Sequence, residues 1–243
     1  MKVFFPSLLA LLLLLGCAAA PDTPVYVEGA DQTYYQLNDR RFHRFVVPDR
    51  DAFAKYDKLL LFPLQLDGML ILRSTDQEIN RSWGGSTYED MLPYVSSFDE
   101  LAAHLFAQGR TFDLTNTGGP NVLAVEFRLK SYRPHTPRLD AMGGGTVGDF
   151  TVTSFGDLRI EVVLADSQSG ELVAVLEDAV RVSPRSFGMT AFGNTTTVDA
   201  SARNTRGNQR AAWRRTFRHW LARFDADLND LREEALKSAA IEI

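Results

Sequence analysis

The sequence predicts an α+β domain, in which helices pack on one face of a largely antiparallel sheet. Three segments carry this prediction. Residues 122–130 alternate apolar and polar side chains, as expected for a strand with one buried and one solvated face. Two β-rich runs, 158–165 and 172–182, flank a polar turn and indicate a hairpin. Residues 208–237 place apolar side chains every three or four positions, which predicts a long C-terminal amphipathic helix.

Two further elements precede these segments. Residues 57–66 are a continuous apolar run between charged and turn residues, which predicts a buried strand that Pro63 interrupts near its end. Ser97, followed by acidic residues and then by apolar residues at helical spacing, predicts a helix that ends at Gly109. The side chains of 122–130 expected on the core face are Leu123, Val125, Phe127 and Leu129.

The hairpin turn also suggests a register. If Asp166 lies opposite Glu171, then Arg159 lies opposite Asp178, and this pair of opposite charges favours the register. The closing helix is expected to lie across the sheet and to bury an apolar stripe. This stripe consists of Trp213, Phe217, Trp220, Phe224, Leu228 and Leu231.

The N-terminus predicts where the protein is located. Lys2 precedes an apolar segment that is too short to span a bilayer stably, and the segment closes with Leu14-Leu15-Gly16-Cys17. This tetrad resembles the lipobox of bacterial lipoproteins, whose cysteine receives a diacylglycerol and becomes the acylated first residue after cleavage. The resemblance implies a covalent lipid on Cys17. The alternative is an ordinary secretory signal cleaved after Ala20.

The cysteine count favours lipidation, because Cys17 is the only cysteine and has no partner for an intramolecular disulfide. The next residue is Ala18. In lipoproteins of bacteria with two membranes, aspartate at that position resembles an inner-membrane retention signal, so its absence implies the outer membrane, with the domain facing the periplasm. Two or three acyl chains on one residue make a lasting anchor, so the chain is expected to be tethered to the membrane.

Three parts of the chain are therefore expected. Residues 1–16 form a lipoprotein signal peptide, 17–50 a lipidated N-terminus and tether, and 51–237 a single periplasmic α+β domain. With 45% hydrophobic and 23% charged residues, the composition is ordinary for a folded protein. The net charge of −5 provides no general attraction to nucleic acid, so we expect no nucleic-acid partner.

Together with the lipobox, the strand Lys55-Tyr56-Asp57-Lys58-Leu59-Leu60-Leu61-Phe62-Pro63-Leu64 resembles part of a known protein family. The hairpin phrase at 164–171 and the Trp-rich closing helix add to this resemblance. The family consists of bacterial lipoproteins known only as domain of unknown function 3313 (DUF3313). The resemblance covers most of the mature chain and implies its fold and location. Because the family has no established activity, no catalytic residue follows from it.

Candidate catalytic and metal-binding residues do not form a recognisable set. The four histidines, His43, His104, His135 and His219, lie far apart, so we expect no metal site and no cofactor beyond the lipid. Ser86 lacks the second glycine of a nucleophile elbow. Since an enzyme needs a convergent group of reactive side chains, we expect a protein without catalytic activity.

The closing helix has an unusual order of charges. Seven arginines, among them Arg210, Arg214 and Arg218, precede five acidic residues, which is the order that the helix dipole disfavours. One interpretation is a binding site for phosphate-bearing lipid, lipopolysaccharide, glycan or an acidic partner, since guanidinium groups bind anions with two parallel hydrogen bonds. The other, which we favour, is intramolecular pairing together with ordinary surface arginines.

Two long linkers, 131–154 and 183–207, are expected to leave the sheet at the end opposite the hairpin turn. The extended hairpin register places Phe150 opposite Phe187 and Gly148 opposite Met189. A projecting ribbon of this kind would form a docking surface, whereas the alternative is two disordered loops. The residues of this candidate rim are Met142, Phe150, Phe187, Met189 and Phe192.

Three functions fit these features. The first is a non-enzymatic interaction or envelope-assembly module that has an envelope protein as its partner. The second is an envelope enzyme that acts on cell-wall or lipid material, and the third is a carrier of an apolar envelope ligand. Converging His, Asp and Ser side chains would favour the enzyme and a large apolar cavity the carrier.

Overall fold

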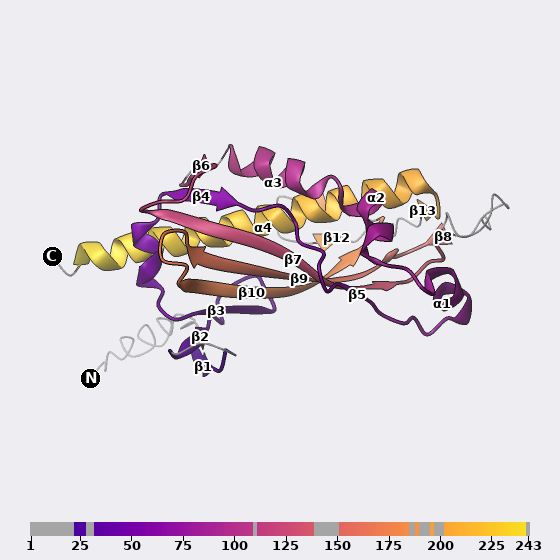
Figure 1. Cartoon of the computed structure of the whole chain (residues 1–243), viewed down its shortest axis with the longest axis horizontal. Coiled ribbons are helices and arrows are strands. Elements are labelled where there is room, and N and C mark those ends of the chain that lie inside the picture. The colour runs from indigo at the N-terminus through magenta and orange to yellow at the C-terminus, as the bar shows by residue number, and fades with distance from the viewer. Residues whose placement is uncertain are drawn as a thin grey trace, which may run out of the picture.

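A long helix, α4, runs along a nine-stranded sheet in the computed structural model (Figure 1). The structure describes residues 22–27, 32–108, 111–138, 151–184, 188–189, 195–196 and 202–241. The predicted α+β class and the largely antiparallel sheet are confirmed. None of the described helices is both long and apolar enough to cross a membrane.

The elements have the following bounds. The strands are β1 (Thr23–Val25), β2 (Tyr34–Gln36), β3 (Arg44–Val47), β4 (Lys58–Leu61), β5 (Leu70–Ile71), β6 (Asp113–Thr115), β7 (Val122–Pro134), β8 (Thr151–Val152), β9 (Gly156–Asp166), β10 (Leu172–Val182), β11 (Gly188–Met189), β12 (Thr195–Thr196) and β13 (Ala202–Arg203). The helices are η1 (Asp51–Lys55), α1 (Gln77–Trp83), η2 (Tyr88–Met91), α2 (Leu92–Val95), α3 (Phe98–Phe106) and α4 (Arg206–Ile241).

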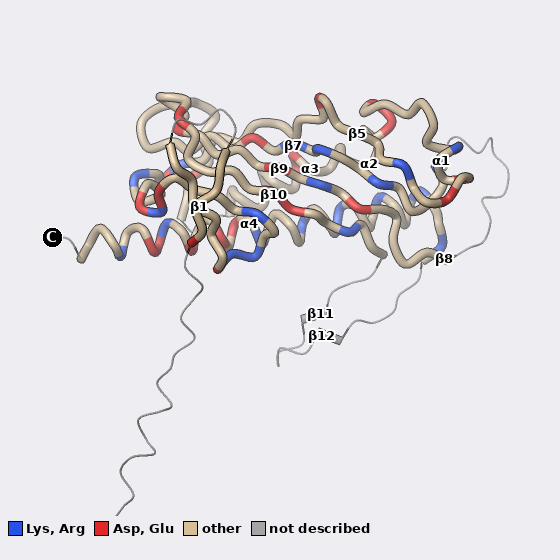
Figure 2. The backbone as a smooth tube through the Cα atoms, turned by 90° about the horizontal axis from the view of Figure 1, so that it is seen from below, with Lys and Arg blue, Asp and Glu red and all other residues tan. Residues whose placement is uncertain are grey.

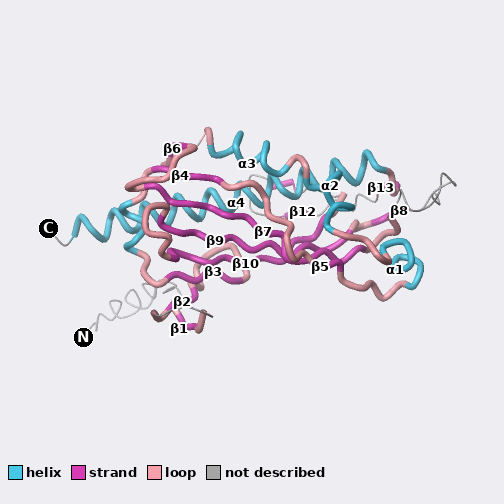
Figure 3. The backbone as a smooth tube through the Cα atoms, in the orientation of Figure 1, coloured by secondary structure: helices cyan, strands magenta, loops and turns pink. Residues whose placement is uncertain are grey.

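The large sheet has the strand order β1-β2-β3-β10-β9-β7-β4-β6, and β5 also pairs with β7. Its pairs are antiparallel except those of β4 with β6 and β7 and that of β5 with β7. Parallel neighbours need a long crossover, and the segment from α1 to α3 supplies it between β4 and β6 (Figure 3).

Packing confirms the buried faces predicted for the two periodic segments, which are β7 and α4. The predicted core-face residues of β7 are at most 2% exposed, and the six predicted stripe residues of α4 are at most 1% exposed. The ring of Phe127 in β7 packs against Phe98 of α3 and Phe224 of α4, at centroid distances of 5.1 and 5.6 Å. Both helices therefore cover the same face of the sheet, as expected.

The predicted elements in the first half of the domain are also present, with shorter bounds. β4 ends at Leu61, before Pro63, whose ring cannot donate a ladder hydrogen bond. The helix expected after Ser97 is α3, which ends at Phe106.

The hairpin turn forms as predicted, but the register beyond it does not. The amide of Asp166 donates to the carbonyl of Glu171 at 2.8 Å. A bulge between Leu172 and Ala174 then shifts the pairing by one residue, so that Arg159 lies opposite Ala179. The predicted pairing of Arg159 with Asp178 is wrong.

The shift changes the environment of Asp178, because a slip of one residue moves a side chain to the other face of a sheet. Asp178 is 8% exposed and lies on the helix-covered face. Its carboxylate accepts a hydrogen bond from Nε1 of Trp220 at 3.0 Å and pairs with Arg223 at 2.5 Å.

The segment expected to be a tether contains part of the fold. Strands β1 to β3 lie between residues 23 and 47, and β3 pairs with β10 of the large sheet. The folded domain thus begins before residue 51. Residues 1–16 and Cys17 lie outside the described residues.

Candidate functional site

The first half of α4 presents a row of arginines. Arg206, Arg210, Arg214 and Arg218 are exposed and follow each other at four-residue spacing, so they lie along one side of the helix. Figure 2 shows the charged positions along α4. We call these four residues the arginine row.

The arginine row borders two hollows. Arg206 and Arg210 line a hollow of about 170 Å³ together with Asp90 of η2 and with Pro93 and Tyr94 of α2. The next two, Arg214 and Arg218, line a groove of about 460 Å³ between α3 and α4. The remaining residues of that groove are Glu100, Leu101, His104, Leu105 and Gln108.

Internal ion pairing leaves most of the arginine row unneutralised. Arg214 lies 3.9 Å from Glu100, and both side chains are well exposed. Within the described part of the chain, Arg206, Arg210 and Arg218 form no ion pair. The guanidinium groups are therefore available to carboxylate or phosphate groups.

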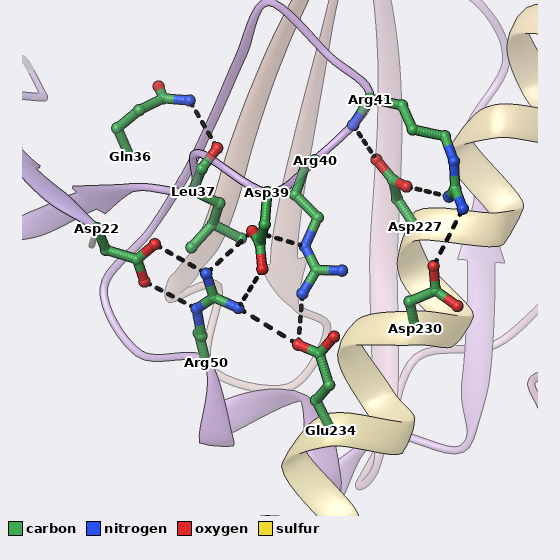
Figure 4. A network of polar contacts seen from close by, with 10 residues as sticks. All are labelled: Asp22, Gln36, Leu37, Asp39, Arg40, Arg41, Arg50, Asp227, Asp230 and Glu234. Atoms are coloured by element: carbon green, nitrogen blue, oxygen red, sulfur yellow. Dashed lines mark hydrogen bonds and ion pairs between the residues drawn. The ribbon is translucent and has the colours of Figure 1, made fainter. Parts of the chain in front are cut away.

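The acidic half of α4 has internal partners instead. Asp227 accepts hydrogen bonds from the amide of Arg41, at 3.0 Å, and from its side chain, which also reaches Asp230 at 3.3 Å (Figure 4). Glu234 pairs with Arg40 at 2.5 Å. Burial raises the pKa of Asp227 above its ordinary value, although the contacts with Arg41 oppose this rise.

The unusual order of charges in α4 therefore has two explanations. The acidic second half of α4 pairs with arginines of the loop between β2 and β3. This half agrees with the interpretation that the charges of α4 pair within the molecule. The arginine row has no comparable internal partners among the described residues, so the anion-binding interpretation stays open for Arg210, Arg214 and Arg218.

Arg50 fixes the start of the folded chain. Its Nε and Nη2 atoms donate to the two carboxylate oxygens of Asp22, each at 2.8 Å, and the guanidinium also contacts Asp39 and Glu234 (Figure 4). The hydrogen bonds with Asp22 raise the pKa of Arg50 further above its already high value. Burial acts to raise the pKa of Asp39, but the hydrogen bond and charge of Arg50 and the charge of Arg40 outweigh it, so this pKa lies below its usual value.

A Ser-His-Asp contact lies at the other end of the sheet. Nδ1 of His135 is 3.1 Å from Oγ of Ser154, and Nε2 of His135 is 3.1 Å from Asp157. Sequence reasoning missed this group because its members are far apart in the chain. The pairing of Pro134 with Gly156 brings them together, and a register for β7 and β9 would have indicated it.

The surroundings of Ser154 do not suit acyl transfer. Its Oγ donates to backbone carbonyls, at 3.3 Å from that of Gly156 and 3.2 Å from that of Val182. An acyl-transfer site needs hydrogen-bond donors where the oxyanion develops, whereas these neighbours are acceptors. The contacts tie together the ends of β9 and β10, which is a structural role.

The open face of the sheet has a large hollow of about 1040 Å³. Half of its lining residues are charged, among them Arg133, Asp157 and Arg159, so it does not resemble the apolar cavity of a lipid carrier. The described residues contain no group of three or more His, Cys, Asp or Glu side chains that could hold a metal ion.

The candidate rim is described only in part. Met142, Phe150, Phe187 and Phe192 lie outside the described residues. The backbone of Met189 is described, and it pairs with Thr195 in a small local sheet. The pairing of Met189 with Gly148 is thus not observed.

The end of the first linker and the start of the second lie side by side, as expected if both linkers share one end of the sheet. Ser183 Oγ donates to the carbonyl of Thr153 at 3.0 Å, where both chains leave the sheet. Beyond this point β8, in the first linker, pairs with β13, which lies near the end of the second linker just before α4. The single projecting ribbon predicted from the hairpin register is not supported, because Val152 lies opposite Ala202 and Met189 lies opposite Thr195.

Comparisons with known proteins give no family. No family and no curated protein matches the chain. Among solved structures it is similar to a PelC variant dodecamer from Paraburkholderia phytofirmans, at 10% identity over 70% of this chain and 90% of that chain, with a TM-score of 0.28. It is also similar to the hypothetical protein CT253 from Chlamydia trachomatis, at 10% identity over 71% and 98%, with a TM-score of 0.31. Scores this low carry no argument about function.

Proposed function

We propose that the protein is a lipoprotein, anchored through Cys17 to the periplasmic face of the outer membrane, whose domain is a non-enzymatic interaction module. Its partner is an acidic surface of another envelope protein. The arginine row of α4 carries this proposal, since its guanidinium groups are exposed and largely without internal partners among the described residues.

The shape of the arginine row favours an extended partner over a single small anion. From Arg206 to Arg218 the row extends about 18 Å at the helical rise of 1.5 Å per residue. Four guanidinium groups over this length match a series of carboxylates along a strand or helix. Basic residues near a helix N-terminus also lower the stability of the helix. Binding to an acidic partner explains their presence, whereas helix stability does not.

Replacing Arg210, Arg214 and Arg218 with glutamine is expected to abolish partner capture. The measurement is a pull-down of the native lipidated protein from envelope extract, read by mass spectrometry, for the wild type and the triple variant. The wild type should retain one reproducible acidic protein, and rising salt should release it, because salt screens exposed charges.

A matched control removes three exposed arginines elsewhere, by substituting glutamine for Arg73, Arg81 and Arg159. This control should retain the partner. Equal capture by both triple variants would rule out the arginine row, and a wild-type protein that recovers no partner would rule out the interaction module.

The contact among Ser154, His135 and Asp157 favours a second candidate, an envelope hydrolase. In that case a fluorophosphonate probe should label the wild type, and Ser154→Ala should lose the label. We expect no labelling, because carbonyl oxygens surround the hydroxyl. Labelling that depends on Ser154 would contradict the non-enzymatic function.

A further inference from the structure

The ribbon formed by β1 and β2 has an exposed aromatic face. Tyr26 is 80% exposed and Tyr35 is 40% exposed, whereas Tyr34 is buried at 1%. Tyr35 lies opposite Pro24, and Tyr26 is two residues beyond Pro24, so these three residues share one face of the ribbon. Tyr34 points the other way, and its hydroxyl donates to the carbonyl of Leu172 in β10 at 3.3 Å.

This aromatic face lies close to the proposed lipid attachment site. Five residues, 17–21, precede Asp22, so a fully extended chain places Cys17 at most about 18 Å from Asp22. Asp22 is itself held by the two hydrogen bonds from Arg50. The first strand of the domain therefore cannot move far from the membrane that holds Cys17.

We propose that Pro24, Tyr26 and Tyr35 rest on the lipid surface into which Cys17 is anchored. This inference depends on the proposed lipidation of Cys17. Tyrosine suits the boundary between lipid and water, because its ring is apolar and its hydroxyl stays hydrated. Arg50 pairs with Asp22 and Asp39, which lessens the repulsion between these carboxylates and anionic headgroups.

The proposed contact gives the domain a defined orientation. β1 and β2 project below β3 at one edge of the large sheet, in the half of the molecule that contains the C-terminal end of α4, whereas β8 and α1 lie near the opposite end of the long axis (Figure 1). The end where the two linkers leave the sheet then lies away from the site of this contact.

Added tryptophans provide the test. Lipidated Tyr26→Trp and Tyr35→Trp proteins are reconstituted in vesicles of phosphatidylethanolamine and phosphatidylglycerol, with or without bromine on the acyl chains. The native Trp83, Trp213 and Trp220 are at most 6% exposed and supply a constant background. Brominated lipid should reduce the added emission about twofold at both positions, as expected for residues at the lipid boundary.

Tyr88→Trp is the matched control, because Tyr88 is 44% exposed but lies on η2, away from β1 and β2. Brominated lipid should leave the emission of the tryptophan at position 88 unchanged. Flotation of the vesicles reports anchoring separately. Proteins that float without quenching at positions 26 and 35 would overturn the membrane contact and leave the lipid anchor intact. Proteins that do not float would refute the anchor and, with it, the contact.

Discussion

Replacing Trp220 with alanine is expected to lower the free energy of unfolding by about 3 to 5 kcal/mol. The side chain is completely buried, and its ring packs against Phe42 and Phe224 at centroid distances of 5.7 and 5.9 Å. Its removal also takes a hydrogen-bond donor from the buried carboxylate of Asp178. Urea unfolding followed by circular dichroism measures the loss.

Two variants separate the causes of this effect. Trp220→Phe keeps an aromatic ring but removes the donor, and we expect it to cost about 1 to 3 kcal/mol. Ala222→Ser changes an exposed position of the same helix and should stay within about 0.5 kcal/mol of wild type. A Trp220→Ala protein that is as stable as wild type but loses a binding activity would show that the aromatic stripe is a ligand platform.

Replacing Cys17 with serine is expected to remove the protein from the membrane fraction. Serine cannot accept the thioether-linked diacylglycerol, so the chain should stay unprocessed or become soluble. Without its acyl chains the domain loses about 0.8 kcal/mol of membrane binding for each buried CH₂ group. Fractionation of the envelope and mass spectrometry of the mature N-terminus measure both effects.

Ala19→Ser is the matched control, because it places the same hydroxyl two residues away from Cys17 and should leave anchoring unchanged. An unmodified mature chain that begins after Ala20 would instead establish an ordinary secretory signal.

Elements with a strong hydrophobic period were predictable from sequence. β7 and α4 each bury one side against a neighbour, and this burial selects apolar residues at every second position in the strand and every third or fourth in the helix. The hairpin turn was predictable because Asp166 and Gly170 have turn chemistry. The amides of Gln168 and Ser169 donate to the Asp166 carboxylate, and Gly170 has a φ of 75°.

Features that depend on distant partners were not predictable. β1 to β3 are only three or four residues long, too short to show a period. β3 adds to the edge that β10 offers, and β2 and β1 then add in turn. The bulge after Leu172 leaves no signal in composition, yet it moves Asp178 from the expected solvent-facing pair to the core.

The candidate site was predictable only as a pattern of charges. The sequence shows that arginines precede acids in α4, and the anion-binding candidates Arg210, Arg214 and Arg218 follow from that order. It does not show that Arg40 and Arg41 neutralise the acidic half, because those partners lie more than 180 positions earlier in the chain. Ion pairs in the folded structure decide which charged side chains remain available to a partner.

The contacts of Arg50 also determine how the molecule would carry tension. Arg50 joins Asp22, near the proposed anchor, to Glu234 in the second half of α4, and the helix extends about 42 Å from Glu234 back to Arg206. A partner held by the arginine row and pulled away from the membrane would load α4 along its axis. The contacts between helix and sheet would then resist in shear over their whole length, instead of peeling apart one after another from β1.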